Sequence, residues 1–425
     1  AGIILSTHAS LLSSAILCPY PPDIDPTTHT QLAVIGGGPA GLRAAELAAT
    51  AGIDTTLFEG KPSVGRKFLV AGKGGLNLTH GESLEQFVGR YTTAEEAPKH
   101  WPELIEACTP NELRNWASEL GVETFQASSG RVYPRALKAA PLLRRWVAHL
   151  KRHGVRFETN HLWEGLIPGT PHRLSFSHGR EYTADAVVFA LGGASWPSTG
   201  SDGAWLAKFE SLGIPCSPLE PANCGWECDW PKDTLDAAEG KPIKNICVSA
   251  GDQQATGELL VTRYGLEGGT IYQLGRSLRN MPEPSIAIDF KPSFSHEKLV
   301  RKMESVRRDF LKEARIRWKL GDAAHAILAR DPWPDAESLA QRTKHCVIPL
   351  KRPRPITEAI SSAGGVKWEA LDSGLMIKQM PGVYLAGEMI DWEAPTGGYL
   401  MQGCFATGTK AALSAIERLR SDRRA

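Results

Sequence analysis

Leu32-Ala-Val-Ile-Gly-Gly-Gly-Pro-Ala-Gly41 is the stretch of sequence that decides the fold. Residues 32–35 are a short apolar run that favours a buried strand, and the alanine-rich residues 42–51 favour a helix. Between them, Gly36, Gly38 and Gly41 match the pattern G-x-G-x-x-G. In this pattern the first glycine makes the tight turn, the second lets a phosphate approach the backbone, and the third lets helix and strand pack closely. The stretch therefore predicts the strand, turn and helix of a dinucleotide-binding fold.

An acidic residue follows this motif at the spacing that nucleotide binding requires. Residues 54–58 predict a second strand, which ends at Glu59, 18 residues after Gly41. In dinucleotide-binding folds an acidic side chain about 20 residues beyond the motif accepts a hydrogen bond from a ribose hydroxyl. FAD and NAD share this fingerprint, so it predicts a βαβ unit for a dinucleotide without choosing between the two.

The composition limits the class of protein. The 425 residues suffice for two or three domains, and 48 Lys and Arg against 47 Asp and Glu give a net charge of +1. Because such a chain has no global field toward polyanions, we expect a small-molecule substrate and not nucleic acid as the main partner. No apolar run reaches the ~18 residues of a membrane-spanning helix, so no membrane partner is expected. The eight cysteines lack a repeated short spacing, which favours a reducing, cytoplasmic location.

Further segments resemble the BaiN-like (YhiN-type) family of FAD-dependent flavoproteins. They are Gly65-Arg-Lys-Phe-Leu-Val-Ala-Gly-Lys-Gly-Gly-Leu-Asn-Leu-Thr79 and residues 190–200, 262–268, 387–391 and 396–399. The resemblance covers most of residues 31–420, and the chain departs from it at Arg263, where the family usually has His, and at Leu400, where it usually has Asn. It implies FAD, and not NAD, at the fingerprint. Since no second G-x-G-x-x-G is present, NAD(P)H could serve the flavin only by docking transiently.

The family's fold implies an α/β protein with a glutathione-reductase-like Rossmann FAD-binding domain built from both chain ends. An inserted β-barrel-like domain and a small helical subdomain complete it. On this basis we predict a loose N-terminal extension (1–30), a first part of the FAD-binding domain (31–195), an inserted β-rich domain (196–295), a helical subdomain (296–348) and a second part of the FAD-binding domain (349–425). The residue pattern predicts helices at 103–120, 139–153 and 296–320, and the charges of the last are typical of a solvated helix face.

The same resemblance carries cofactor-binding roles onto individual residues. It assigns the ADP half of FAD to Gly36, Gly38, Ala40, Gly41 and Glu59. It assigns the middle of FAD and the flavin edge to Arg66, Lys67, Gly72 and Asn77. It assigns the closure over pyrophosphate, ribityl chain and isoalloxazine to Gly387, Glu388, Gly397, Gly398 and Tyr399.

Catalytic roles are less constrained by the sequence. Arg263, Tyr264 and Tyr399 are the predicted catalytic residues, and Asp391 and Glu393 are further acid or base candidates. The absence of cysteine from residues 65–79 argues against a disulfide reductase, which needs a redox-active cysteine pair at the flavin. A single C-x3-C at 224–228, without a second pair or neighbouring histidines, does not predict a metal site.

The resulting hypothesis is an FAD-dependent oxidoreductase, a reductase that moves hydride from NAD(P)H through flavin N5 to a small conjugated organic acceptor. An FAD-dependent dehydrogenase or monooxygenase is the alternative on the same scaffold. A flavin-bound RNA-modification or regulatory binding protein is a third, with which the basic residues 344–354 are compatible. The sequence leaves the substrate, the choice of NADH or NADPH and the oligomeric state open.

Overall fold

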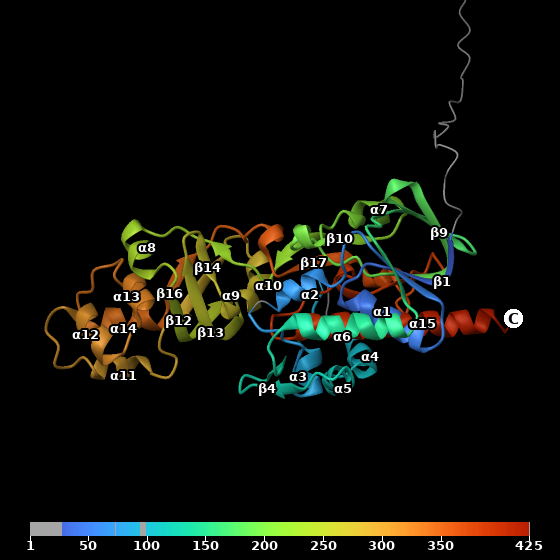
Figure 1. Ribbon diagram of the computed structural model, residues 1–425. Coiled ribbons are helices and arrows are strands. Elements are labelled where there is room, and N and C mark those ends of the chain that lie inside the picture. The colour runs from blue at the N-terminus through green and yellow to red at the C-terminus, as the bar shows by residue number, and fades with distance from the viewer. Residues whose placement is uncertain (1–27, 73, 94–98, 425) are drawn as a thin grey trace, which may run out of the picture.

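A computed structural model describes residues 28–72, 74–93 and 99–424, so the predicted extension lies almost wholly outside the described residues. A seven-stranded sheet forms the core of one body of the molecule (Figure 1). Its strand order is β6-β2-β1-β9-β8-β7, and β18 also pairs with β9. The strands are β1 (Thr28–Ile35), β2 (Thr55–Glu59), β6 (Arg156–Thr159), β7 (Trp163–Ile167), β8 (His172–Phe176), β9 (Arg180–Phe189) and β18 (Val383–Leu385). The pairings among β6, β2, β1, β9 and β18 are parallel, as the fingerprint predicts.

Helices from the two ends of the chain pack together on this sheet. They are α1 (Pro39–Thr50), which follows the fingerprint, and α15 (Tyr399–Asp422). Gly408 allows the close approach, because a Cβ there would lie 2.5 Å from the carbonyl oxygen of Ala40. Further elements of this body are α2 (Arg66–Ala71), α3 (Leu84–Val88), α4 (Trp101–Ala107), α5 (Pro110–Glu119), α6 (Ala139–Arg152), α7 (Trp205–Ser211) and the small strands β3 (Thr79–His80), β4 (Thr124–Gln126) and β5 (Arg131–Pro134).

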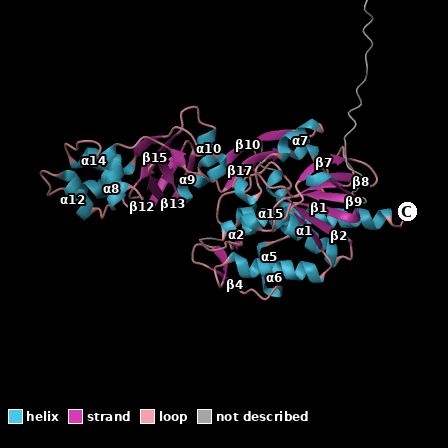
Figure 2. Ribbon diagram, turned by 45° about the horizontal axis from the view of Figure 1, so that its top comes forward, coloured by secondary structure: helices cyan, strands magenta, loops and turns pink. Residues whose placement is uncertain are grey.

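A second body has its own core, which runs from Trp226 to Leu350 (Figure 2). Its antiparallel half-barrel sheet has the order β11-β14-β13-β12-β15-β16. The strands are β11 (Trp226–Glu227), β12 (Pro242–Ala250), β13 (Gln253–Thr262), β14 (Gly265–Glu267), β15 (Ser285–Asp289) and β16 (Cys346–Pro349). The helices are α8 (Lys232–Ala238), α9 (Gly269–Gln273), α10 (Gly275–Arg279), α11 (His296–Arg301), α12 (Phe310–Arg317), α13 (Asp322–Leu328) and α14 (Ala336–Lys344).

The chain enters and leaves the second body side by side. β10 (Cys216–Ala222) pairs in antiparallel fashion with β17 (Ser361–Val366), and the second core lies between them in the sequence. Residues 205–214, which the sequence assigned to the insert, bury Trp205, Phe209 and Ile214 in the first core. The helices of residues 296–348 share a core with the strands of the insert. The division into five segments stays a prediction.

Two predicted helices are each interrupted, and those predictions were wrong in this respect. Residues 103–120 divide into α4 and α5 because Thr109 caps a new helix, with Pro110 in its first turn and Glu112 completing a capping box. Residues 296–320 divide into α11 and α12, with Asp309 in the left-handed conformation directly before α12. The predicted helix at 139–153 is confirmed as α6. Among the described residues, no helix combines the length and hydropathy needed to cross a membrane.

Candidate cofactor site

A cavity of about 510 Å³ opens at the carboxyl ends of the parallel strands. Its walls include the residues that end or follow β1, β2, β9 and β18, which is where ligands bind in open α/β sheets. The residues of the predicted cofactor site that line it are Gly36, Gly38, Ala40, Glu59, Arg66, Lys67, Gly387 and Glu388. The fold therefore brings residues from an early part of the chain, Gly36 to Lys67, and from a late part, Gly387 and Glu388, to one cavity.

The three motif glycines are each needed for a different reason. Gly36 has φ +110°, and a Cβ there would lie 2.3 Å from the carbonyl oxygen of Ala190. A Cβ at Gly41 would lie 2.0 Å from the carbonyl oxygen of Gly36, so this glycine permits close packing of helix and turn. A Cβ at Gly38 would meet no protein atom within 4 Å, and Gly38 lines the cavity. The fold thus leaves the space beside Gly38 empty.

Glu59 is held at the end of β2 by two backbone groups. Its Oε2 accepts a hydrogen bond from the Gly37 N–H at 3.0 Å, and its Oε1 accepts one from the Lys61 N–H at 2.8 Å. Burial raises the pKa of this carboxyl above its ordinary value, although both hydrogen bonds oppose the shift. The side chain is therefore fixed in orientation at the cavity wall.

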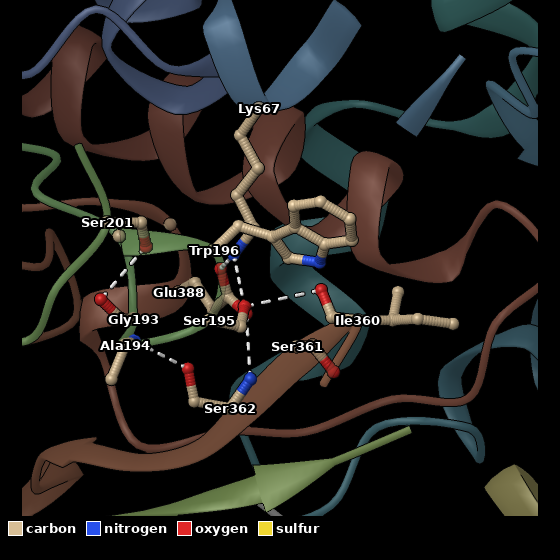
Figure 3. A network of polar contacts seen from close by, with 12 residues as sticks. Lys67, Gly193, Ala194, Ser195, Trp196, Ser201, Ile360, Ser361, Ser362 and Glu388 are labelled. Atoms are coloured by element: carbon tan, nitrogen blue, oxygen red, sulfur yellow. Dashed lines mark hydrogen bonds and ion pairs between the residues drawn. The ribbon is translucent and has the colours of Figure 1, made fainter. Parts of the chain in front are cut away.

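Lys67 and Glu388, which also line the cavity, form an ion pair (Figure 3). Lys67, in the first turn of α2, donates from Nζ to Glu388 Oε2 at 2.7 Å and to Ser195 Oγ at 2.7 Å. Glu388 Oε1 accepts from the Ser362 N–H at 2.9 Å. Both carboxylate oxygens are thus satisfied inside a partly buried wall.

The same network reaches the segment that returns from the second body. Ser195 Oγ donates to the Ile360 carbonyl at 3.3 Å, and Ser362 Oγ accepts from the Ala194 N–H at 2.8 Å (Figure 3). Ile360 itself lines the cavity. Sequence reasoning missed Ser362 and Ile360, which no motif contains, whereas Ser195 lies inside the segment 190–200 that carried the family resemblance.

Two buried polar atoms of predicted cofactor residues have no hydrogen-bond partner among the described residues: Arg66 Nε and Asn77 Oδ1. Burying a polar group without a partner is costly, so an unpartnered atom at a cavity wall is open to a ligand. Arg66 lines the cavity, but Asn77 does not. Gly72 does not line it either, and a Cβ there would lie 2.5 Å from the Ala139 Cβ, so Gly72 serves the packing of α2 on α6.

The start of α15 lies differently from the prediction. Gly397 and Gly398 have φ of +131° and +105°, and a Cβ on Gly398 would lie 2.5 Å from the Thr79 carbonyl carbon. Neither glycine lines the cavity, which the next turn reaches through Leu400, Met401 and Cys404. These three residues were not predicted as site residues, and their spacing on one helix face was the available signal.

The Tyr399 side chain does not line the cavity either. Its hydroxyl donates to Glu82 Oε1 at 2.8 Å, and its ring stacks on the His80 ring with centroids 5.4 Å apart. Burial and the bond to Glu82 raise the pKa of Tyr399 far above its ordinary value, and Arg90, bonded to the same carboxylate, opposes the shift. The structure therefore places this hydroxyl with Glu82, away from the cavity.

The two predicted catalytic residues of the insert also lie outside the cavity wall. The Arg263 side chain is 82% exposed and pairs with Glu239 at 3.3 Å. The Tyr264 hydroxyl hydrogen-bonds to Glu267, and the Arg354 guanidinium lies 4.4 Å from the Tyr264 ring centroid. The structure does not bring Arg263, Tyr264 and Tyr399 together, and their catalytic roles remain predictions.

Comparison with known proteins finds relatives over almost the whole chain. A 3-dehydro-bile acid delta(4,6)-reductase of Clostridium scindens is 28% identical over 418 residues, covering 91% of this chain and 99% of that protein. A ribosomal RNA dihydrouridine synthase of Haemophilus influenzae is 21% identical over 412 residues, covering 91% and 98%.

The fold resembles that of a dehydrogenase of known structure. A 3-ketosteroid-delta4-(5alpha)-dehydrogenase of Rhodococcus jostii RHA1 superposes with a TM-score of 0.52 at 18% identity, covering 92% of this chain and 97% of that chain. The family model of the HI0933-like protein Rossmann domain matches residues 30–414. The predicted family is thereby confirmed: the chain belongs to the HI0933-like (BaiN/YhiN-type) family of FAD-dependent Rossmann flavoprotein oxidoreductases.

Proposed function

We propose that this protein is a reductase that takes hydride from NAD(P)H and delivers it to a carbon–carbon double bond conjugated with a carbonyl. The observation that carries the proposal is the cavity, in which the fingerprint turn, Glu59 and the Lys67–Glu388 pair face one space. Bound there, FAD supplies hydride acceptance and donation at flavin N5. The protein's residues supply binding, orientation and charge.

The cavity fits FAD on its own chemistry. The empty space beside Gly38 suits a pyrophosphate, and Glu59, fixed by two backbone N–H groups, suits a ribose hydroxyl. The unpartnered Arg66 Nε is a donor for a phosphate or ribityl oxygen. Lys67 and Glu388 would hold the part of the cofactor between the pyrophosphate and the ring. Gly72, Asn77, Gly397 and Gly398 do not line the cavity, so their contact with the cofactor stays a prediction.

The choice of acceptor rests on the chemistry that the relatives' names share. One name describes reduction in a 3-dehydro-bile acid, and the other describes formation of dihydrouridine. Both are reductions of a carbon–carbon double bond in conjugation with a carbonyl. That common bond type, and not either molecule, is what we carry to this chain. NAD(P)H remains the proposed donor, docking transiently.

The test is anaerobic reduction of the yellow holoprotein by NADH or NADPH, followed by reoxidation with a panel of acceptors. We expect bleaching of the flavin by one of the two donors and rapid recovery with enones such as 4-en-3-one steroids, but not with saturated ketones. Recovery only with oxygen would instead support the monooxygenase alternative. A colourless protein that does not take up FAD would contradict the whole proposal.

A further inference from the structure

The second body contributes almost nothing to the cavity. Residues 209–359 are all described, and none of them lines it. Figure 1 places α11 and α12 at the end of the molecule farthest from the seven-stranded sheet. A segment of this size with its own core, projecting away from the cofactor site, invites the question of what its far end contacts.

The charge of that end differs from the charge of the rest. Residues 291–319, here called the basic tip, hold 10 Lys and Arg against 4 Asp and Glu, a net charge of +6. The remainder of the chain therefore carries 38 against 43, a net charge of −5. The net charge of +1 for the whole chain is the sum of two regions of opposite sign, so it does not argue against a polyanionic partner for the tip.

Most cations of the tip have no carboxylate partner. Arg315 pairs with Asp322 at 2.7 Å and Arg317 with Glu313 at 3.0 Å. Within the described part of the chain, the other eight form no ion pair: Lys291, Lys298, Arg301, Lys302, Arg307, Arg308, Lys312 and Lys319. Six of these eight, from Lys298 to Lys312, lie on or between α11 and α12, and all six are exposed. The charges of residues 296–320 were expected to mark a solvated helix face, but Lys302, Arg307 and Arg308 lie between the two helices, and cations outnumber carboxylates in the tip.

The apolar residues of the tip show which anion it fits. Leu299 of α11 and Ala314 of α12 are fully buried in the second core. Ile316 of α12, which is 67% exposed, is the only exposed large hydrophobic residue in the described tip, and a single residue does not form the apolar face with which a helix binds a bilayer. The Phe294 ring lies under two ammonium groups, with Lys298 Nζ at 4.7 Å and Lys302 Nζ at 5.3 Å from its centroid. Ammonium groups over a half-buried ring, with guanidinium groups elsewhere on the same tip, match a phosphate backbone with adjoining bases.

We propose that the basic tip is a docking surface for RNA, which it binds through the phosphate backbone. Arg301, Arg308 and Lys312 contact phosphates, and Phe294 offers a stacking surface beside Lys298 and Lys302. The proposal stands apart from the reductase proposal, because binding at the tip requires no turnover at the cavity.

The test measures binding of a fluorescein-labelled 30-nucleotide RNA stem-loop to the holoprotein at several salt concentrations. One variant neutralises the tip (Arg301→Gln, Arg308→Gln and Lys312→Gln). A control variant makes the same charge change on the other body (Arg135→Gln, Arg173→Gln and Arg420→Gln). We expect the tip variant to lose affinity by at least about tenfold and its salt slope to fall by about 2, with unchanged FAD content. The control should bind RNA within about twofold of the wild type.

Three outcomes would overturn the proposal. They are no RNA binding by the wild type, an equal loss in both variants, and tighter binding of phosphatidylserine vesicles or polyglutamate than of RNA. Flavin reduction and reoxidation of the same three proteins are followed separately. A failure of the reductase proposal would appear in these flavin measurements and would not change the RNA-binding result.

Discussion

Gly38 and Gly321 occupy equivalent positions in two helices and differ in what lies beside them. Each is an N-cap in extended conformation, before α1 and α13 respectively, and a Cβ on either would meet no protein atom within 4 Å. Only Gly38 lines the cavity. We therefore expect Gly38→Val to abolish FAD retention, because its side chain would fill the space of the pyrophosphate.

Gly321→Val is the matched control, since it places the same side chain at the same helical position outside the cavity. It should retain FAD at the wild-type ratio, as measured by the 450 nm to 280 nm absorbance of the purified proteins. Equal FAD content in the two variants would show that the glycine turn does not contact the cofactor.

Lys67 supports a second prediction at the residue scale. Lys67→Met removes the cation and leaves Glu388, whose side chain is 11% exposed, with only the Ser362 N–H as a partner. We expect a loss of about 1–3 kcal/mol in the free energy of unfolding and a lower flavin reduction potential, because a negative charge then stands unbalanced at the cavity. Lys67→Arg keeps the charge and should restore most of the potential. If a redox titration gives the same flavin potential for Lys67→Met and Lys67→Arg, the Lys67–Glu388 pair does not influence the flavin.

His172 gives a pH dependence of stability. Burial in β8, together with the charge of Arg418, holds the pKa of His172 below its ordinary value of 6.5. The folded state therefore favours the neutral ring, and its Nδ1 accepts from the Gly169 N–H. The stabilisation is present above pH 6.5 and is lost as pH falls from 6.5 through the lowered pKa. In urea unfolding, the free energy of unfolding should fall more between pH 7.5 and pH 5.5 for the wild type than for His172→Gln. An equal fall in the two proteins would show that another group causes the pH dependence.

At the scale of elements, α10 of the second body anchors the loop that leads into α15. Arg279 Nη2 lies 2.7 Å from both carboxylate oxygens of Glu393, and Nη1 donates to the Pro221 carbonyl at 3.1 Å. The Arg279 and Glu393 side chains are 10% and 13% exposed. Asn223 ties the same loop from the entry strand, through the Ala394 carbonyl and the Thr396 N–H.

Removing one partner of the Arg279–Glu393 ion pair should lower the free energy of unfolding more than removing both partners. We expect Arg279→Met to lower the free energy of unfolding by about 3 kcal/mol, because it leaves a buried carboxylate, and to speed FAD dissociation. The double variant Arg279→Met/Glu393→Leu should lose less than Arg279→Met alone. A double-mutant cycle with additive losses would show that the two side chains do not interact.

The elements also show how far the sequence could be read. The fingerprint predicted β1, α1 and β2 because local propensity and ligand geometry coincide there. The break at Thr109-Pro110 was visible as a capping box, but the apolar period across it looked continuous. The link from Lys67 to Ser195 and Glu388 could not be predicted, because it joins side chains 128 and 321 positions apart that belong to no one motif. The Ser362 N–H, 26 positions before Glu388, completes it through the backbone.

At the scale of the whole molecule, the two cores should respond differently to cofactor. If FAD binds at the cavity as proposed, it stabilises the first core by mass action, whereas the second core contains no cavity residue. We expect calorimetry with increasing free FAD to move one unfolding transition upward and leave the other within about 1 °C. A single transition that moves as a whole would show that the joining segments couple the cores fully.

The pairing of α1 with α15 has a consequence for how the protein is made on the ribosome. The second core lies in one continuous stretch, so it can collapse as soon as residue 350 has left the exit tunnel. The first core must wait with β1 and α1 exposed until α15 emerges, because Gly408 packs on Ala40. The dinucleotide turn is thus synthesised before the second body and completed after it, and early release of the nascent chain would yield a folded second body without a cofactor site.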